Sequence, residues 1–212
     1  EIEHNMIDGD GDYDGEVELE QAYINYHAEN WGFKAGVILA SAGYINETHE
    51  PPTFLSVERP DYAKHVIPTT WFGNGFGFYG NFSGIDWKLN IMEDLKSSGI
   101  GNGIRDARGK GYKTTAYDWT KNFRFDYNEM LGINIGGSMT INNSPVNFKD
   151  DGAVDESIDV SLMEFHGSYD ANNLTTTMEH GTISYTDDTA TYGTSGYYLD
   201  VGYDVSKMVG CE

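Results

Sequence analysis

The chain has 212 residues, enough for one β-domain, and no linker-like segment divides it. Its 34 acidic and 13 basic residues give a formal net charge of −21, which argues against a nucleic-acid partner. A mean hydropathy of −0.50 and the lack of any run of about eighteen apolar residues exclude a transmembrane helix. They do not exclude a transmembrane β-barrel, because apolar and polar residues alternate along its strands and the mean hydropathy stays low.

Large apolar and polar side chains alternate with a period of two along most of the chain, which predicts strands. The predicted strands cover 16–27, 32–41, 71–82, 85–94, 115–128, 131–143, 156–170, 173–186 and 195–205, with a strand end at 1–6. The pattern is clearest where one side carries Ile85, Trp87, Leu89 and Ile91 and the other carries Asp86, Lys88 and Asn90.

The second face of these strands decides the fold class. A soluble sandwich buries its apolar face against another sheet and has short strands. Strands of about ten residues, with one aromatic-rich face and one face of charges and glycines, favour a barrel with lipid outside and water inside. Short connections at 81–84, 128–132 and 170–173 alternate with long ones at 42–70, 95–114, 143–156 and 187–195. The sequence therefore predicts an all-β, antiparallel, porin-like transmembrane β-barrel.

The ends of the chain suggest that the barrel continues beyond it. Residue 1 is Glu1, and the chain stops at Cys211 and Glu212, just after a predicted strand. We interpret 1–212 as a single barrel domain that is incomplete at both ends. About ten strands enclose too little space for an aqueous channel, so about 16–18 strands are expected in the full protein.

One long connection carries a family resemblance. Residues 46–71 read NETHEPPTFLSVERPDYAKHVIPTTW, which resembles the signature of the phosphate-selective porin O and P family of bacterial porins. The resemblance extends to 16–23 and 101–108 and, more weakly, to 196–205. It implies a homotrimeric barrel in the outer membrane of a Gram-negative bacterium, in contact with lipid and lipopolysaccharide. Phosphate selectivity is not carried over, because it needs converging Lys and Arg side chains and this chain has few.

The same connection supplies most of the candidate pore-lining residues. A charged, Pro-containing loop over 46–70 is unsuited to lipid and long enough to fold into a barrel lumen, where opposing charges would sort solutes. A solvated loop outside the barrel is an equal alternative. The candidates are Glu47, His49, Glu50, Glu58, Arg59, Lys64 and His65 in the loop, Lys88, Lys121 and Arg124 on strands, and Arg105 and Arg108 after a glycine-rich segment.

Metal and enzymatic chemistry have weaker support. Asp10, Asp12 and Asp14 match the start of a calcium loop, but Gln21 occupies the twelfth position, where a Glu is needed. A solvated acidic turn is the simpler interpretation, calcium binding is the alternative, and no other cofactor is expected. No arrangement for nucleophilic catalysis stands out, so we do not expect an enzyme.

The preferred function is passive diffusion of small hydrophilic solutes or ions through a water-filled outer-membrane barrel. One alternative is a secreted, soluble all-β protein that binds glycans or calcium. Another is an outer-membrane barrel enzyme with carboxylates and histidines on its loops.

Overall fold

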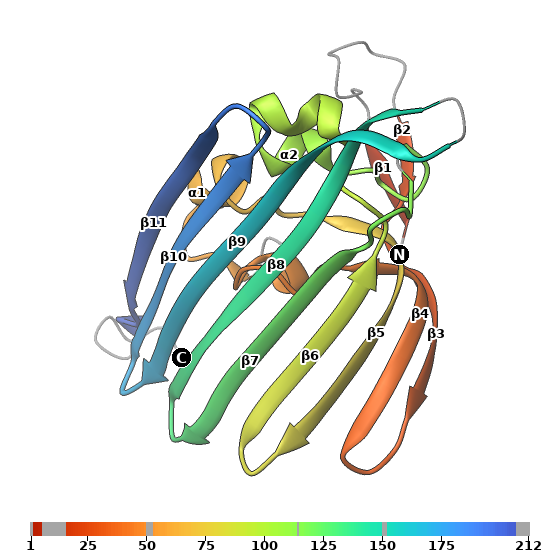
Figure 1. Ribbon diagram of the computed structural model, residues 1–212. Coiled ribbons are helices and arrows are strands. Elements are labelled where there is room, and N and C mark those ends of the chain that lie inside the picture. Colours follow the sequence, from red (N-terminus) through yellow and green to blue (C-terminus); the bar gives the residue numbers. More distant parts are fainter. Residues whose placement is uncertain (1, 6–15, 50–52, 114, 150–151, 207–212) are drawn as a thin grey trace.

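A single sheet of nine antiparallel strands dominates the computed structural model, which describes residues 2–5, 16–49, 53–113, 115–149 and 152–206 (Figure 1). Its strands follow one another in chain order, so every strand pairs with the strands that precede and follow it in the sheet. They are β3 (Ala22–His27), β4 (Trp31–Leu39), β5 (Phe72–Phe82), β6 (Ile85–Met92), β7 (Thr120–Met130), β8 (Ile133–Phe148), β9 (Val154–Ala171), β10 (Leu174–Thr186) and β11 (Thr191–Tyr203). The prediction of an all-β antiparallel fold is confirmed.

The predicted strand at 16–27 is in fact two strands. β2 (Glu16–Leu19) pairs with β1 (Ile2–Asn5) in a separate two-stranded ribbon, and the large sheet begins only at β3. The chain leaves the ribbon at Glu20, whose side chain is buried.

The predicted long connections at 42–70 and 95–114 are confirmed, and they alternate with short ones. The predicted long connections at 143–156 and 187–195 were wrong: the strands extend further than predicted, and only 149–153 and 187–190 join them. Ser83 and Gly84 join β5 to β6, and Asn172 and Asn173 join β9 to β10, all four with positive φ. Positive φ at both central residues matches the strand twist and is typical of two-residue hairpins. The long connections hold the 3-10 helices η1 (Asn46–Thr48) and η3 (Ser97–Asn102) and the helices α1 (Tyr62–His65) and α2 (Ile104–Ala107). No helix among the described residues is long and apolar enough to cross a membrane.

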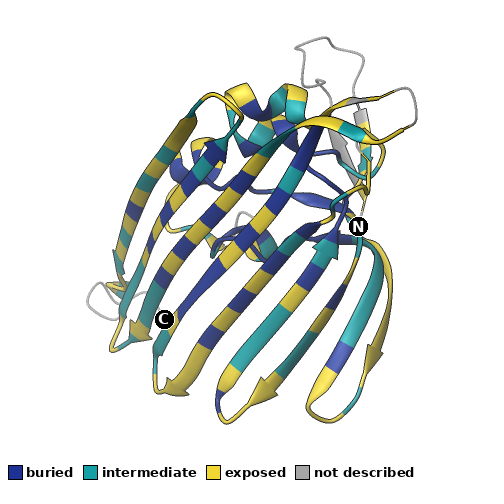
Figure 2. Cartoon of the chain, viewed as in Figure 1, coloured by how far each residue is buried: buried dark blue, intermediate teal, exposed yellow. Residues whose placement is uncertain are grey.

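One face of the sheet exposes apolar side chains and the other buries polar ones, which is the opposite of the arrangement in a soluble domain. On β7, Phe123 is 45% exposed, while Asn122 beside it is fully buried. Alternating stripes also follow β9, β10 and β11 in Figure 2, whereas β3 is exposed along its whole length and most of β4 is intermediate. We call the side of Phe123 the outer face and the side of Arg124 the inner face. Exposed outer-face side chains include Phe76, Phe78, Leu89, Phe125, Ile135, Met139, Met163, Phe165, Leu199 and Val201. In the described part of the chain, no second sheet covers them.

The apolar core lies on the inner face, beneath the long connections. Ile67, Ile100 and Ile104 from these connections belong to one buried cluster with Leu162 of β9 and Ile183 of β10. The sequence predicted only charges and glycines on this face. The difference arises because the connections cover part of the sheet, and apolar side chains are buried where they do.

Candidate pore-lining site

Charged side chains on the inner face form two rows that run across neighbouring strands. The strand register aligns Lys88, Arg124, Ser138 and Glu164 in the first row, and Asp86, Asp126, Gly136, His166 and Glu179 in the second. Positive charge is therefore concentrated on β6 and β7 in the first row, whereas β9 and β10 carry Glu164 and Glu179. The register separates the two signs of charge only within the first row, because Asp86 and Asp126 of the second row lie on the same two strands as Lys88 and Arg124.

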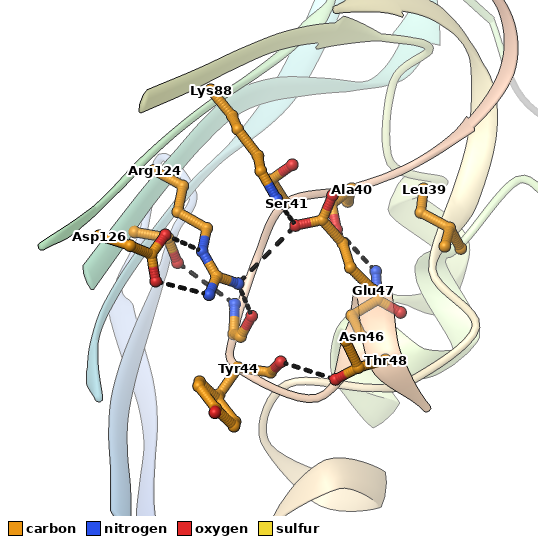
Figure 3. A network of polar contacts seen from close by, with 12 residues as sticks. Leu39, Ala40, Ser41, Tyr44, Asn46, Glu47, Thr48, Lys88, Arg124 and Asp126 are labelled. Carbon is orange, nitrogen blue, oxygen red and sulfur yellow. Dashed lines mark hydrogen bonds and ion pairs between the residues drawn. The ribbon is translucent and has the colours of Figure 1, made fainter. Parts of the chain in front are cut away.

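Arg124 connects this wall to the 46–70 loop and the residues that lead into it (Figure 3). Its Nε and Nη2 donate to the two carboxylate oxygens of Asp126 at 2.7 and 2.8 Å, a bidentate arrangement. Its Nη1 donates to the Gly43 carbonyl oxygen at 2.6 Å and lies 3.8 Å from Glu47 Oε2. The side chain is buried, so these partners replace water around the charge.

His166 extends the network along the second row. Its Nδ1 lies 2.6 Å from Glu164 Oε1 and its Nε2 lies 2.7 Å from Asp126 Oδ1. Carboxylates accept hydrogen bonds, so the form that satisfies both contacts is the imidazolium, which donates from both nitrogens. A Cβ on Gly136 would lie 2.4 Å from His166 Nε2, which explains the glycine at this register position.

The chain just before the loop is held through its backbone. Gly43 N–H donates to Ser138 Oγ at 3.3 Å, and Ser138 Oγ donates to Glu164 Oε2 at 2.8 Å. Tyr44 N–H donates to Glu179 Oε1 at 3.2 Å, and the Tyr44 ring lies 5.1 Å from the His166 ring. Residues 43 and 44 are thus fixed on β8, β9 and β10 by side chains that are themselves held by the rows.

Asn46 closes the base of the loop. Its Nδ2 donates to the carbonyl oxygens of Ala40 at 2.8 Å and Trp71 at 3.0 Å, and its Oδ1 accepts from Trp71 N–H at 2.9 Å. Asn46 is buried, and these bonds join the segment that enters the loop to the segment that leaves it. The loop therefore starts and ends at one point beside the inner face.

Glu47 and Lys88 make the closest charged contact between loop and wall, with 2.6 Å between Oε2 and Nζ (Figure 3). Burial by itself would raise the pKa of the Glu47 carboxyl, but Lys88 and Arg124 outweigh it, and the pKa lies below its usual value. Glu47 is therefore ionised at neutral pH. Lys34 on β4 adds to the positive field at this carboxylate.

The structure brings together three of the predicted pore-lining residues, Glu47, Lys88 and Arg124. Arg108 is buried and donates to the carbonyl oxygens of Thr69 at 2.7 Å and Thr70 at 2.8 Å. Burial lowers the pKa of Arg108 to about 10, so it remains charged while it fixes the C-terminal end of the loop.

The other predicted loop residues are more scattered. His49 Nε2 lies 3.5 Å from Glu20 Oε2, and Arg105 is partly buried on α2. Exposed positions on the loop are Glu58, Arg59, Lys64 and His65. Glu50, Asp10, Asp12 and Asp14 lie outside the described residues, so calcium binding stays a prediction. Within the described ranges, no group of three or more His, Cys, Asp or Glu side chains is placed to hold a metal ion.

The placement of Lys121 was wrong. It pairs in register with Ile91 and Ile141, on the same face as Phe123, and its Nζ donates to Asp118 Oδ2 at 2.9 Å. A period of two fixes the face of every strand residue, whereas the prediction relied on the polarity of the side chain. Lys121 thus lies on the outer face, next to the first residue of β7.

Sequence reasoning missed several members of the site. They are Lys34, Gly43, Tyr44, Ser138 and Glu179. Alternation in 32–41 and 173–186 could have placed Lys34 and Glu179 on the polar face. Gly43 and Tyr44 contact the wall chiefly through their backbones, for which the sequence holds no signal.

Acid is expected to loosen the contact between Glu47 and the wall. Because the folded-state pKa of Glu47 is lowered, its ionised form stabilises the folded state above the usual carboxyl pKa, and this contribution is lost as the pH falls through the lowered value. Thermal unfolding between about pH 7 and about pH 3 should show wild type approaching Glu47→Gln in acid. Glu58→Gln, an exposed control on the same loop, should follow wild type. Parallel curves for wild type and Glu47→Gln would contradict the assignment.

Comparison with known proteins gives limited matches. No family model matches the chain. An uncharacterized protein of Aquifex aeolicus (strain VF5) is 41% identical over 98 residues, or 46% of this chain. The match spans 22% of that relative, less than a quarter of its length. The solved structure of OmpT, an outer membrane protein of Vibrio cholerae in its trimer form, is similar with a TM-score of 0.48 and 11% identity, over 90% of this chain and 67% of that one. These matches do not establish membership of the phosphate-selective porin family.

Proposed function

We propose that this chain forms part of the wall of an outer-membrane β-barrel through which small hydrophilic solutes or ions diffuse passively. The observation that carries the proposal is the exposure of the apolar outer face along β5–β11, while the polar inner face is buried and hydrogen-bonded. Lipid is the solvent that suits an exposed belt of Phe, Leu, Ile, Met and Tyr side chains, and alternation of this kind is typical of membrane barrels.

The open sheet supports a larger barrel than these nine strands make. Among the described residues, β3 and β11 each pair on one side only. A barrel has no free edge, because unpaired backbone groups are too costly in lipid. Further strands would continue the sheet, up to the 16–18 proposed for the full protein. A longer chain also agrees with the length of the Aquifex relative. Assembly as a homotrimer in contact with lipopolysaccharide remains part of the proposal.

The 46–70 loop provides the narrowing in this proposal. It is attached on the inner face at Glu47, and residues 43 and 44 just before it are held on β8–β10. Lys34 and Lys88 on the wall and Glu47 on the loop place charges of both signs beside the passage, where they would act on a passing solute. The titratable groups of the site hold one another and the loop, so the proposed function involves no chemical step.

The test is conductance of the full-length protein. Purified in detergent and added to a planar lipid bilayer, it should produce stepwise increases in current, and the reversal potential in a salt gradient should report its ion preference. Extraction without detergent, together with no conductance in the bilayer, would overturn the proposal in favour of a soluble β-protein.

A further inference from the structure

A cavity of about 590 Å³ opens on the inner face at the end of the sheet that carries the long connections. Residues 100–103 of η3 and the turn that follows it form one wall, and Ile158, Tyr185 and Tyr192 of β9–β11 form another. His65 at the end of α1 and Asp187 in the turn after β10 complete the lining. The volume falls within the range of about 300–1,000 Å³ that is usual for small-molecule sites.

Aromatic and aliphatic groups line one part of this cavity. Tyr185 and Tyr192 are opposite each other in the pairing of β10 with β11. Tyr185 is buried, whereas Tyr192 is 62% exposed and leaves much of its ring open to a ligand. Ile100 and Ile158 add aliphatic surface. A Cβ on Gly101 would meet no atom within 4 Å, so the space beside this wall is open.

Polar groups line the rest of the cavity. The side chains of His65, Asn102 and Thr194 make no hydrogen bond to another described residue. Asp187 uses its Oδ1 to accept from Thr189 and Ala190, which leaves Oδ2 without a partner in the described part of the chain. The cavity therefore offers an amide, a hydroxyl, an imidazole and a carboxylate oxygen around an aromatic surface.

We propose that this cavity binds a neutral sugar unit. A pyranose ring has an apolar face of C–H groups that packs on an aromatic ring, and a rim of hydroxyls that both donate and accept hydrogen bonds. An apolar ligand would leave the polar groups unsatisfied, at a cost in free energy. An anionic ligand would meet the Asp187 carboxylate with only His65 as a possible opposing charge. The inference rests on the proposed function in one respect: the long-connection end of the sheet is the mouth of the pore, where an arriving solute would be held.

The test is isothermal titration of the full-length protein in detergent with glucose, galactose, N-acetylglucosamine and maltose. At least one of these sugars should bind at millimolar concentrations, and Tyr192→Ala should weaken that binding by about tenfold. Tyr197→Ala is the matched control, because Tyr197 is 78% exposed on the outer face of the same strand. It should leave binding within about twofold of wild type.

Three outcomes would overturn the assignment: no binding of any of the four sugars, equal losses in the two variants, or tighter binding of glucose 6-phosphate than of glucose. Since titration in detergent does not require a conducting pore, its failure is separable from failure of the proposed function. A protein that conducts without binding sugar contradicts only this inference. One that binds sugar without conducting contradicts only the channel.

Discussion

Replacing Arg124 with glutamine is expected to loosen the attachment of the 46–70 loop to the wall, where the Glu47–Lys88 pair remains, and to increase the single-channel conductance of the proposed barrel. The change removes the bidentate pair with Asp126 and the contacts to Gly43 O and Glu47. Breaking a buried ion pair by removing one partner typically costs about 3–5 kcal/mol, because the remaining charge is left uncompensated. Asp126 keeps its contact with His166 and is therefore not left without a partner. The substitution should mainly weaken the contacts that hold the loop on the sheet.

The matched control for this variant is Lys121→Gln on the same strand. It removes one positive charge from the outer face, where Lys121 contacts Asp118 and not the loop. Circular dichroism should show that both variants keep their sheet content, so that a difference in conductance reports the loop. If Arg124→Gln retains its sheet and conducts like wild type, then Arg124 does not set the width of the passage.

Introducing arginine at Phe123 is expected to prevent most of the protein from inserting into lipid vesicles. Phe123 lies on the outer face between Leu89 and Met139 of the neighbouring strands and 6.2 Å from the Phe125 ring. A charged side chain facing lipid near the bilayer centre costs about 2–4 kcal/mol in barrel proteins. A penalty of that size is a large fraction of the net stability of a folded domain.

The variant Phe123→Leu separates the effect of introducing a charge from the effect of losing the aromatic ring. Leucine keeps an apolar surface, so this variant should insert to nearly the same extent as wild type, measured as the folded fraction recovered with vesicles. A water-facing position would give the opposite order, with Phe123→Arg folding and remaining soluble at least as well as Phe123→Leu. That result would remove the main support for a membrane barrel.

The strands and the exposure of their faces could be predicted because both follow from a local period of two. The outer-face residues Tyr197, Leu199 and Val201 are exposed, as their alternation with polar neighbours indicated. The error at Lys121 arose because side-chain polarity and alternation disagreed there, and the alternation was correct.

The loop attachment could not be predicted because its partners are far apart in sequence. Gly43 and Arg124 are 81 positions apart, and Tyr44 and Glu179 are 135 apart. Which inner-face residues meet the loop depends on strand register and on the path of the backbone through 40–46, neither of which a period of two defines. The links of His166 to Asp126 and of Glu164 to Ser138 likewise depend on the pairing across β7, β8 and β9.

The same sequence separations bear on the order of assembly. Each strand pairs with its neighbour in the chain, so the sheet can grow strand by strand, with short loop closures everywhere except between β4 and β5 and between β6 and β7. The contacts of Gly43 and Tyr44 close much longer segments of chain, which costs more conformational entropy. That cost is offset only when β7, β8 and β10 together provide the partners of these two residues. We therefore expect the attachment of residues 43 and 44 to the sheet to form late in folding, and in the proposed barrel this step would narrow the passage.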